Sequence, residues 1–174
     1  SCADGDEVLF AWPSFEAYPI VTAVVGAVEV RVPLTGDHEH DLDAMAAAIT
    51  DRTRMVIVCS PNNPTGRAVT QQELIDFMRK VPSRIVVVLD EAYTEFVSDN
   101  AAFEEYPNLC VMRTFSKAYG LAAIRLGYAI ASANVASALR AVGLPFGISS
   151  IAQAAGLAAL APPAQTELGA RVTQ

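Results

Sequence analysis

Residues 84–93 read RIVVVLDEAY, an apolar run rich in β-branched residues that ends in two acids. Such a run is typical of a strand covered on both faces of a sheet. Similar runs occupy 7–11, 54–59 and 109–113, and the capping box TQQE at 70–73 predicts a helix between two of them. Because strands alternate with helices, we expect a three-layer α/β/α sandwich with a mostly parallel sheet.

The remaining elements that we expect are strands at 29–33 and 126–131 and helices at 42–49, 71–81, 134–142 and 149–161. Another apolar helix should run to about Val25, with Ser14 as its N-cap. We expect an exposed acidic loop or short helix at 98–105. The large domain should comprise 1–148, and 149–174 should begin a smaller domain or a connecting helix.

Composition and charge exclude several classes of protein. The 174 residues are 52% hydrophobic, enough for one large core or part of a bigger one. The net charge of −7, without a basic run, argues against a nucleic-acid partner. No apolar run is long enough to span a membrane and no signal peptide is visible, so we expect a cytoplasmic protein without a membrane partner. The three cysteines lack CxxC spacing, which favours reduced thiols over a metal site.

Polar clusters follow three of the expected strands. The motifs SPNNPTG (60–66), DEAY (90–93) and TFSK (114–117) each come directly after an apolar run. In parallel α/β sheets the carboxyl ends of the strands meet at one edge, and ligands bind there. We therefore expect the three clusters to converge on one rim of the sheet.

Lys117 lies among small, hydroxylic and apolar neighbours, an unusual setting for a cation. Where water is scarce, the charged form of an amine is disfavoured, so the neutral amine can attack an aldehyde and form a Schiff base. Thr114 and Ser116 precede the lysine and Arg125 follows it, a set that could bind a phosphate. Taken alone, this stretch is equally compatible with an ordinary surface lysine.

The other two clusters would suit a pyridine aldehyde phosphate bound to Lys117. Asp90 could pair with the protonated ring nitrogen that makes such a ring an electron sink. Asn63 and Tyr93 could donate hydrogen bonds to the phenolate oxygen, and Phe15 could stack on the ring. Each residue also has an ordinary explanation by itself: a capping acid, a turn asparagine, a half-buried tyrosine and a core phenylalanine.

The wording SPNNPTG, DEAYTEF and RTFSKAYGLAAIRLGYAI resembles the fold type I pyridoxal-phosphate aminotransferases, specifically the histidinol-phosphate aminotransferase branch. The resemblance runs from about Asp4 to Leu160 and implies the large cofactor domain of an aspartate-aminotransferase-like fold. Within the branch, AWPSFEAYP and LPFGISSIAQAA are more similar to the aromatic amino acid (phenylalanine) aminotransferases.

Carried over by position, the resemblance implies catalytic roles for Lys117, Asp90 and Tyr93. Lys117 would hold pyridoxal 5′-phosphate and move a proton between the substrate Cα and the cofactor. The implied cofactor-binding residues, with no metal, are Phe15, Asn63, Asp90, Tyr93, Thr114, Ser116, Lys117 and Arg125. The implied reaction exchanges amino and keto groups between an amino donor, either an aromatic amino acid or histidinol phosphate, and a 2-oxo acid such as 2-oxoglutarate. The family also implies a homodimer.

Three parts of the family's site have no counterpart in this sequence: the glycine/serine phosphate turn, the tyrosine lent by the neighbouring subunit, and the arginine that grips the substrate carboxylate. We therefore expect a fragment with weak or no activity by itself, and the amino donor stays open. Another fold type I reaction, a lyase or a decarboxylase, is an alternative, as is an aminotransferase-like effector domain of a transcription regulator. A nucleotide-binding domain is disfavoured because WPSF, not a glycine-rich turn, follows the first strand.

Overall fold

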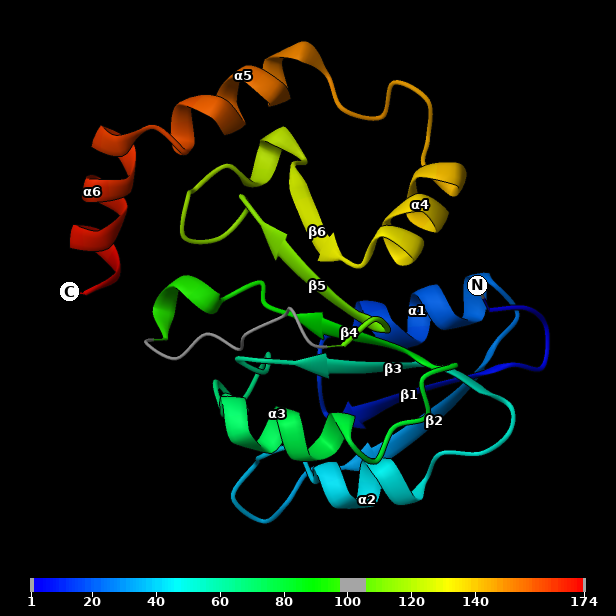
Figure 1. Cartoon of the computed structure of the whole chain (residues 1–174). Coiled ribbons are helices and arrows are strands. Elements are labelled where there is room, and N and C mark those ends of the chain that lie inside the picture. The colour runs from blue at the N-terminus through cyan, green and yellow to red at the C-terminus, as the bar shows by residue number, and fades with distance from the viewer. Residues whose placement is uncertain (1, 98–105, 174) are drawn as a thin grey trace.

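The computed structural model describes residues 2–97 and 106–173. In this part of the chain a six-stranded sheet has the order β2-β1-β3-β4-β5-β6 (Figure 1). Its strands are β1 (Glu7–Trp12), β2 (Val28–Pro33), β3 (Thr53–Cys59), β4 (Val86–Asp90), β5 (Leu109–Thr114) and β6 (Gly127–Ala131). All neighbouring pairs are parallel except β5 and β6, which are antiparallel. The prediction of a mostly parallel α/β sheet is confirmed.

The helices lie between and after the strands. They are α1 (Ala17–Val24), α2 (Leu42–Ala47), α3 (Gln71–Met78), α4 (Ala133–Val142), α5 (Ser150–Ala159) and α6 (Pro162–Val172), with short 3-10 helices η1 (Thr94–Phe96) and η2 (Ala122–Ile124). The predicted capping box opens α3: the Glu73 amide donates to Thr70 Oγ1 (3.3 Å), and the Thr70 amide donates to the Glu73 carboxylate (2.8 Å). The acidic segment expected at 98–105 lies outside the described residues.

The predicted N-cap of α1 is wrong. The helix starts at Ala17 after Glu16, which caps it without a side-chain hydrogen bond. Ser14 instead donates its hydroxyl hydrogen bond to Asn62 Oδ1 at 2.7 Å, a buried contact across 48 positions of sequence. The physical reason is that a buried polar pair must be satisfied, whereas the exposed first turn of a helix can be satisfied by water.

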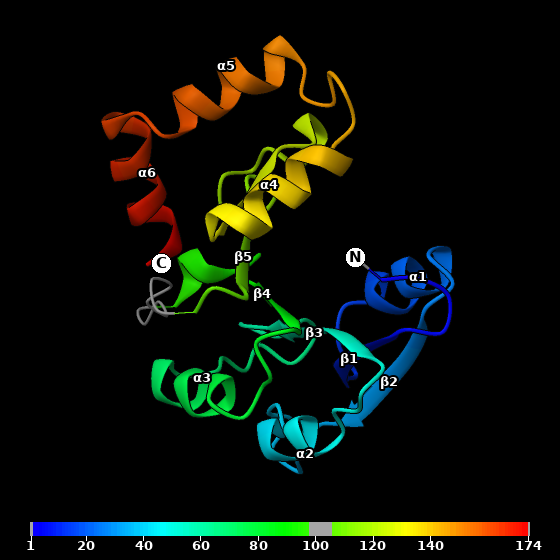
Figure 2. The ribbon, with the colours of Figure 1, turned by 45° about the vertical axis from the view of Figure 1, so that its right-hand side comes forward.

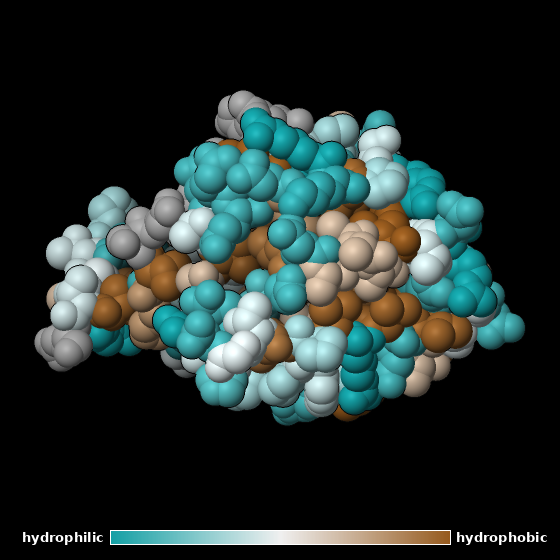
Figure 3. All heavy atoms as spheres, turned by 90° about the horizontal axis from the view of Figure 1, so that it is seen from below, coloured by the Kyte–Doolittle hydropathy of each residue, from teal (hydrophilic) through white to brown (hydrophobic). Residues whose placement is uncertain are grey.

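Helices α2 and α3 cover one face of the sheet (Figure 2). Alternate residues of the strands, such as Leu9 and Val58, point to this side and pack with Met45 of α2 and Phe77 of α3. All four side chains are buried. Seen from below, hydrophobic residues also reach the surface in a band between two hydrophilic margins (Figure 3). The face of the sheet that α2 and α3 cover holds the larger of the two core clusters.

The opposite face is covered less completely. Helices α1 and α4 lie on this side, and a smaller buried cluster joins Phe10 of β1, Tyr18 of α1 and Val88 of β4. Between the two helices the sheet forms the floor of a hollow of about 720 Å³. The strand residues on this floor are mostly apolar, among them Ile57 and Met112. The hollow is therefore a largely hydrophobic surface that ends at the polar rim.

The remaining sequence predictions concern cysteines, metals and membranes. Cys59 and Cys110 are buried free thiols, and Cys2 is a partly buried one, as expected. Within residues 2–97 and 106–173, no group of three or more potential ligands is placed to bind a metal ion. None of the described helices is long and apolar enough to cross a membrane. The proposed boundary between 148 and 149 stays a prediction.

Candidate active site

The loops after β1, β3, β4 and β5 meet at one edge of the sheet. The bond from Ser14 to Asn62 joins the loop after β1 to the loop after β3. Lys117 Nζ, in the loop after β5, lies 5.2 Å from the ring centroid of Tyr93, which follows β4. Asp90 is the last residue of β4 and pairs with the last residue of β3. The predicted convergence of the three polar clusters on one rim is confirmed.

Asp90 is half-buried, and each of its carboxylate oxygens accepts a hydrogen bond. The Ala92 amide donates to Oδ1 (3.1 Å), and the Tyr18 hydroxyl donates to Oδ2 (2.7 Å). Burial, and then the neighbouring Cys59 and Asp90, raise the pKa of Tyr18 far above its usual range. Tyr18 therefore stays protonated and acts as a donor, so the carboxylate is held in one orientation.

Lys117 contacts Tyr93 but lies in the open. Its ammonium is within the distance at which a cation is attracted to an aromatic ring. Its side chain is exposed, so the described structure does not show the water-poor setting that was one of the two interpretations of this stretch. The reason is local: Lys117 projects from a rim loop, and its neighbours Ser116 and Ala118 are too small to cover a long side chain.

Phe15, Asp90 and Thr114 line the 720 Å³ hollow together with Tyr18. Phe15 is 36% exposed and meets the Tyr18 ring edge to face, with centroids 5.7 Å apart. This arrangement braces the phenylalanine against α1 and leaves part of its ring accessible. The hollow thus presents an aromatic ring, a carboxylate and a hydroxyl at its polar end.

Asn63 and Tyr93 line a second hollow of about 290 Å³ at the same rim. Both side chains are half-buried. Pro61 and Pro64 shape the side formed by the loop after β3, and Phe96 of η1 closes the other side. The structure therefore brings together the amide and the phenol that the sequence assigned to one oxygen.

The residues expected to bind a phosphate are only partly assembled. The Ser116 amide donates to Thr114 Oγ1 at 3.1 Å, which fixes these two residues relative to each other. Arg125 has a left-handed backbone (φ 56°) and donates from its guanidinium to the Ala122 carbonyl oxygen at 2.6 Å. This contact places the arginine on its own turn and does not join it to the hydroxyl pair.

Four residues that shape the rim were not predicted from the sequence. Asn62 links both loops: it accepts from Ser14 and donates to the carbonyl oxygen of Pro13 (3.2 Å). Glu91 accepts a hydrogen bond from Arg113 Nε at 2.8 Å, a pair that ties β5 to the residue directly after β4. Burial raises the pKa of Glu91, and the bond from Arg113 offsets part of this increase. The other two are Arg113 and Tyr18, and the sequence signal for Tyr18 is its position three residues after Phe15.

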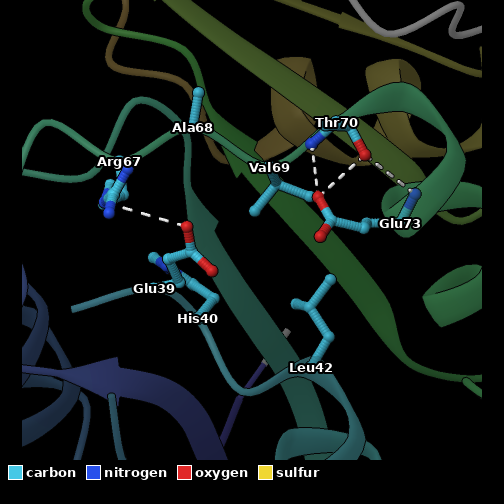
Figure 4. A pocket seen from close by; sticks show the side chains of 8 residues that line it. All are labelled: Glu39, His40, Leu42, Arg67, Ala68, Val69, Thr70 and Glu73. Carbon is cyan, nitrogen blue, oxygen red and sulfur yellow. Dashed lines mark hydrogen bonds and ion pairs between the residues drawn. The ribbon is translucent and has the colours of Figure 1, made fainter. Parts of the chain in front are cut away.

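A separate small pocket of about 110 Å³ lies next to α3, between the chain before α2 and the loop before α3 (Figure 4). Arg67 and Glu39 form an ion pair at its mouth (3.7 Å), and His40 lies beside them. None of the eight residues predicted for the active site lines this pocket. It is small and distinct from the rim described above.

Comparisons with known proteins place the chain in a family. The chain matches the family described as aminotransferase class I and II over residues 1–174. It belongs to this family.

Individual members of the family show which named aminotransferases this chain resembles. An aromatic amino acid aminotransferase of Rhodococcus opacus is 58% identical over 98% of this chain and 48% of its own length. A crystal structure of histidinol-phosphate aminotransferase from Sinorhizobium meliloti, in complex with pyridoxal-5′-phosphate, superposes with a TM-score of 0.91. The two are 33% identical, and the superposition covers 99% of this chain and 48% of the Sinorhizobium meliloti chain. The chain thus spans about half the length of the relatives it matches.

A third structure broadens the comparison. The L-threonine-O-3-phosphate decarboxylase from Porphyromonas gingivalis superposes with a TM-score of 0.79 at 25% identity. The superposition covers 92% of this chain and 48% of the decarboxylase. The same fold therefore carries more than one named reaction.

Proposed function

We propose that this chain is the cofactor-binding part of a pyridoxal-phosphate-dependent aminotransferase that acts on aromatic amino acids. The observation that carries the proposal is the rim itself, where Lys117 lies beside Tyr93 and the carboxylate of Asp90 is held by two donors. Membership of the class I and II family supports it. The aromatic amino donor follows the curated relatives, which are 52–58% identical and named for that substrate.

The side chains at the rim fit the chemistry of the cofactor. Lys117 supplies an amine that can bind an aldehyde, and Asp90 supplies an acid for a ring nitrogen. Phe15 supplies a partly exposed aromatic ring. The amide of Asn63 and the phenol of Tyr93 suit a phenolate oxygen. Thr114, Ser116 and Arg125 are donors for a phosphate, and Arg125 would have to turn away from Ala122 to serve. When bound, the cofactor would supply an electron sink for the negative charge that develops at the substrate Cα.

The chain's own residues would then divide the work. Lys117 would hold the cofactor covalently. Once freed, its Nζ would accept the proton from the substrate Cα and donate it to the cofactor. Asp90 would keep the ring nitrogen protonated through a charge-assisted hydrogen bond. Tyr93 and Asn63 would orient the ring by donating to one oxygen, and Phe15 would limit its tilt by stacking.

The partners follow from the same reaction. We propose an amino acid and a 2-oxo acid such as 2-oxoglutarate as the two substrates, which enter and leave in turn. A homodimer and a cytoplasmic location are part of the proposal, and they rest on the resemblance to the family. Histidinol phosphate is a second candidate donor, because the Sinorhizobium meliloti structure is named for it.

The test of the proposal uses the full-length gene product. Borohydride reduction in the presence of pyridoxal 5′-phosphate should fix the cofactor on Lys117, located by peptide mass spectrometry. Lys117→Arg should lower the rate of transamination from phenylalanine to 2-oxoglutarate by about 10³-fold or more, since it removes the proton carrier. Lys80→Arg is the matched control, because Lys80 is the other lysine of this sequence and pairs with Asp43 away from the rim. Labelling of Lys80 alone, or full activity of the Lys117 variant, would refute the proposal.

A decarboxylase remains the second candidate because a decarboxylase shares the fold. The two reactions differ in their need for an acceptor. Product formation that requires a 2-oxo acid identifies a transaminase, and amine with carbon dioxide released without any acceptor identifies a decarboxylase. Comparison of phenylalanine with histidinol phosphate as donors then separates the two substrate assignments.

A further inference from the structure

Tyr18 lies far from the predicted site residues in sequence but contacts one of them directly. Its hydroxyl donates to Oδ2 of Asp90 at 2.7 Å, across 72 positions of the chain. The other oxygen, Oδ1, accepts from the Ala92 amide. The backbone donor is local to the strand end, so the tyrosine is the contact that joins the carboxylate to α1.

We propose that Tyr18 is a positioning residue that aims the carboxylate of Asp90 at the ring nitrogen of the cofactor. The inference rests on the proposed function. With one donor on each oxygen, rotation of the carboxylate about its Cβ–Cγ bond would break a hydrogen bond, so its remaining lone pairs face the hollow in a fixed direction. A fixed acid partner costs less to organise when the cofactor binds.

The hydroxyl of Tyr18 is itself held in place. The tyrosine is only 6% exposed, and its ring packs against Phe10, with centroids 5.8 Å apart, and against Phe15 at 5.7 Å. In the next turn of α1, Thr22 donates to the carbonyl oxygen of Tyr18 at 2.7 Å. Packing on two sides and a fixed helix leave the hydroxyl little freedom, so the bond to Asp90 transmits the position of α1 to the carboxylate.

The same ring contacts link the acid partner to the stacking ring. Phe15 is braced by Tyr18, and Tyr18 holds Asp90, so a single buried side chain fixes the two residues proposed to contact the cofactor ring from different directions. Removal of the hydroxyl should disturb Asp90 and leave Phe15 in place, because the ring contacts persist. Tyr18→Phe therefore separates positioning of the acid from packing of the helix.

The experiment measures equilibrium binding of pyridoxal 5′-phosphate to the full-length apoprotein by absorbance titration. Tyr18→Phe should weaken binding roughly tenfold, the effect expected for loss of a hydrogen bond to a charged group. Its apoprotein should still unfold cooperatively, at a somewhat lower temperature, because the hydrogen bond is also present without the cofactor. Tyr106→Phe is the matched control, since Tyr106 packs against the other core cluster and should bind with unchanged affinity.

A double-mutant cycle supplies the readout that a packing role would not produce. If Tyr18 acts through Asp90, then Tyr18→Phe should have little further effect on affinity in an Asp90→Asn background. Additive losses, or unchanged affinity in Tyr18→Phe, would overturn the inference while leaving the proposed function in place. Failure of the wild-type protein to bind the cofactor at all would overturn both.

Discussion

The two residues that donate hydrogen bonds to Asp90 lie at very different distances from it in the sequence. Ala92 is two residues away and follows from the turn that any strand end needs, whereas Tyr18 comes from a helix formed much earlier in the chain. The type and place of Asp90 were therefore predictable from DEAY after an apolar run. The orientation of its carboxylate was not predictable, because a contact between α1 and β4 leaves no pattern in the local sequence of either element.

The same distinction explains which rim residues sequence analysis missed. Asn63 was predicted because it lies in the polar cluster SPNNPTG after an apolar run and matches the family's wording. Its neighbour Asn62, however, is the residue that is buried and bonded to the loop after β1. Glu91 was passed over for Asp90, although a buried acid directly after a strand needs a cation, and Arg113 at the end of the next strand supplies it. Successive side chains of an extended backbone point to opposite faces, so Asp90 lines the hollow beside α1 and Glu91 lies on the side of α3.

His40 gives a pH prediction at this scale. Burial lowers its pKa from the usual 6.5 to about 4, and the ring nitrogen Nε2 accepts from the Cys59 amide at 3.4 Å. Between these values the unfolded chain binds a proton that the folded chain does not. The free energy of unfolding should therefore fall as the pH drops through this window, by up to about 3 kcal/mol from this group.

The measurement is urea unfolding of the full-length product between pH 4 and pH 7. His40→Gln should show a smaller loss of stability over this range than the wild type, because its side chain does not titrate. His38→Asn, at an exposed position with a left-handed backbone that asparagine tolerates, should keep the wild-type slope. Equal slopes in all three proteins would contradict the prediction.

At the scale of elements, periodicity and caps predicted most strands and helices. The capping box at Thr70 and the apolar run before Asp90 needed only local information. The start of α1 was predicted wrongly because the hydroxyl of Ser14 bonds across the rim. The direction of β6 had no local signal either, since it depends on how the chain returns after Lys117 and not on the composition of the strand.

Gly127 marks the point where β6 begins beside β5. A Cβ atom there would lie 2.8 Å from the carbonyl oxygen of Arg113, which is backbone and cannot move aside. Gly127→Ala should lower the free energy of unfolding by about 1–3 kcal/mol. The distortion should reach Thr114, which pairs with Gly127 in the ladder.

The control for this prediction is Gly169→Ala in α6, where an added Cβ meets nothing within 4 Å. Alanine is the better helix former, so this variant should be neutral or more stable by up to about 1 kcal/mol. Thermal or urea midpoints of both variants provide the comparison. Equal stability of Gly127→Ala and the wild type would show that the two strands can separate at no cost.

At the scale of the whole molecule, the two faces of the sheet differ in coverage. Helices α2 and α3 bury one face, whereas on the other the floor of the 720 Å³ hollow stays partly open between α1 and α4 (Figure 2). Met112 and Leu139 in this hollow are 46% and 44% exposed. Apolar surface of this kind favours association.

We expect the 174-residue chain, studied alone, to bind a hydrophobic dye and to self-associate as its concentration rises. Met112→Lys should reduce both effects, since it places a charge on the floor of the hollow. Val24→Lys adds the same charge at an exposed position of α1 outside the hollow and should have the smaller effect. Sedimentation velocity over a concentration series measures the association. A larger effect of the α1 variant would show that the chain associates through a surface other than the hollow.

The antiparallel return of β6 has a consequence for the order of folding. Its ladder with β5 closes through the short loop 115–126, whereas β1 reaches β3 only after α1, β2 and α2 have been spanned. Short closures cost less chain entropy and form faster. The backbone around Lys117 can therefore form early as a local hairpin. The surroundings of Asp90 form later, because they need β3 and α1, which are distant in sequence.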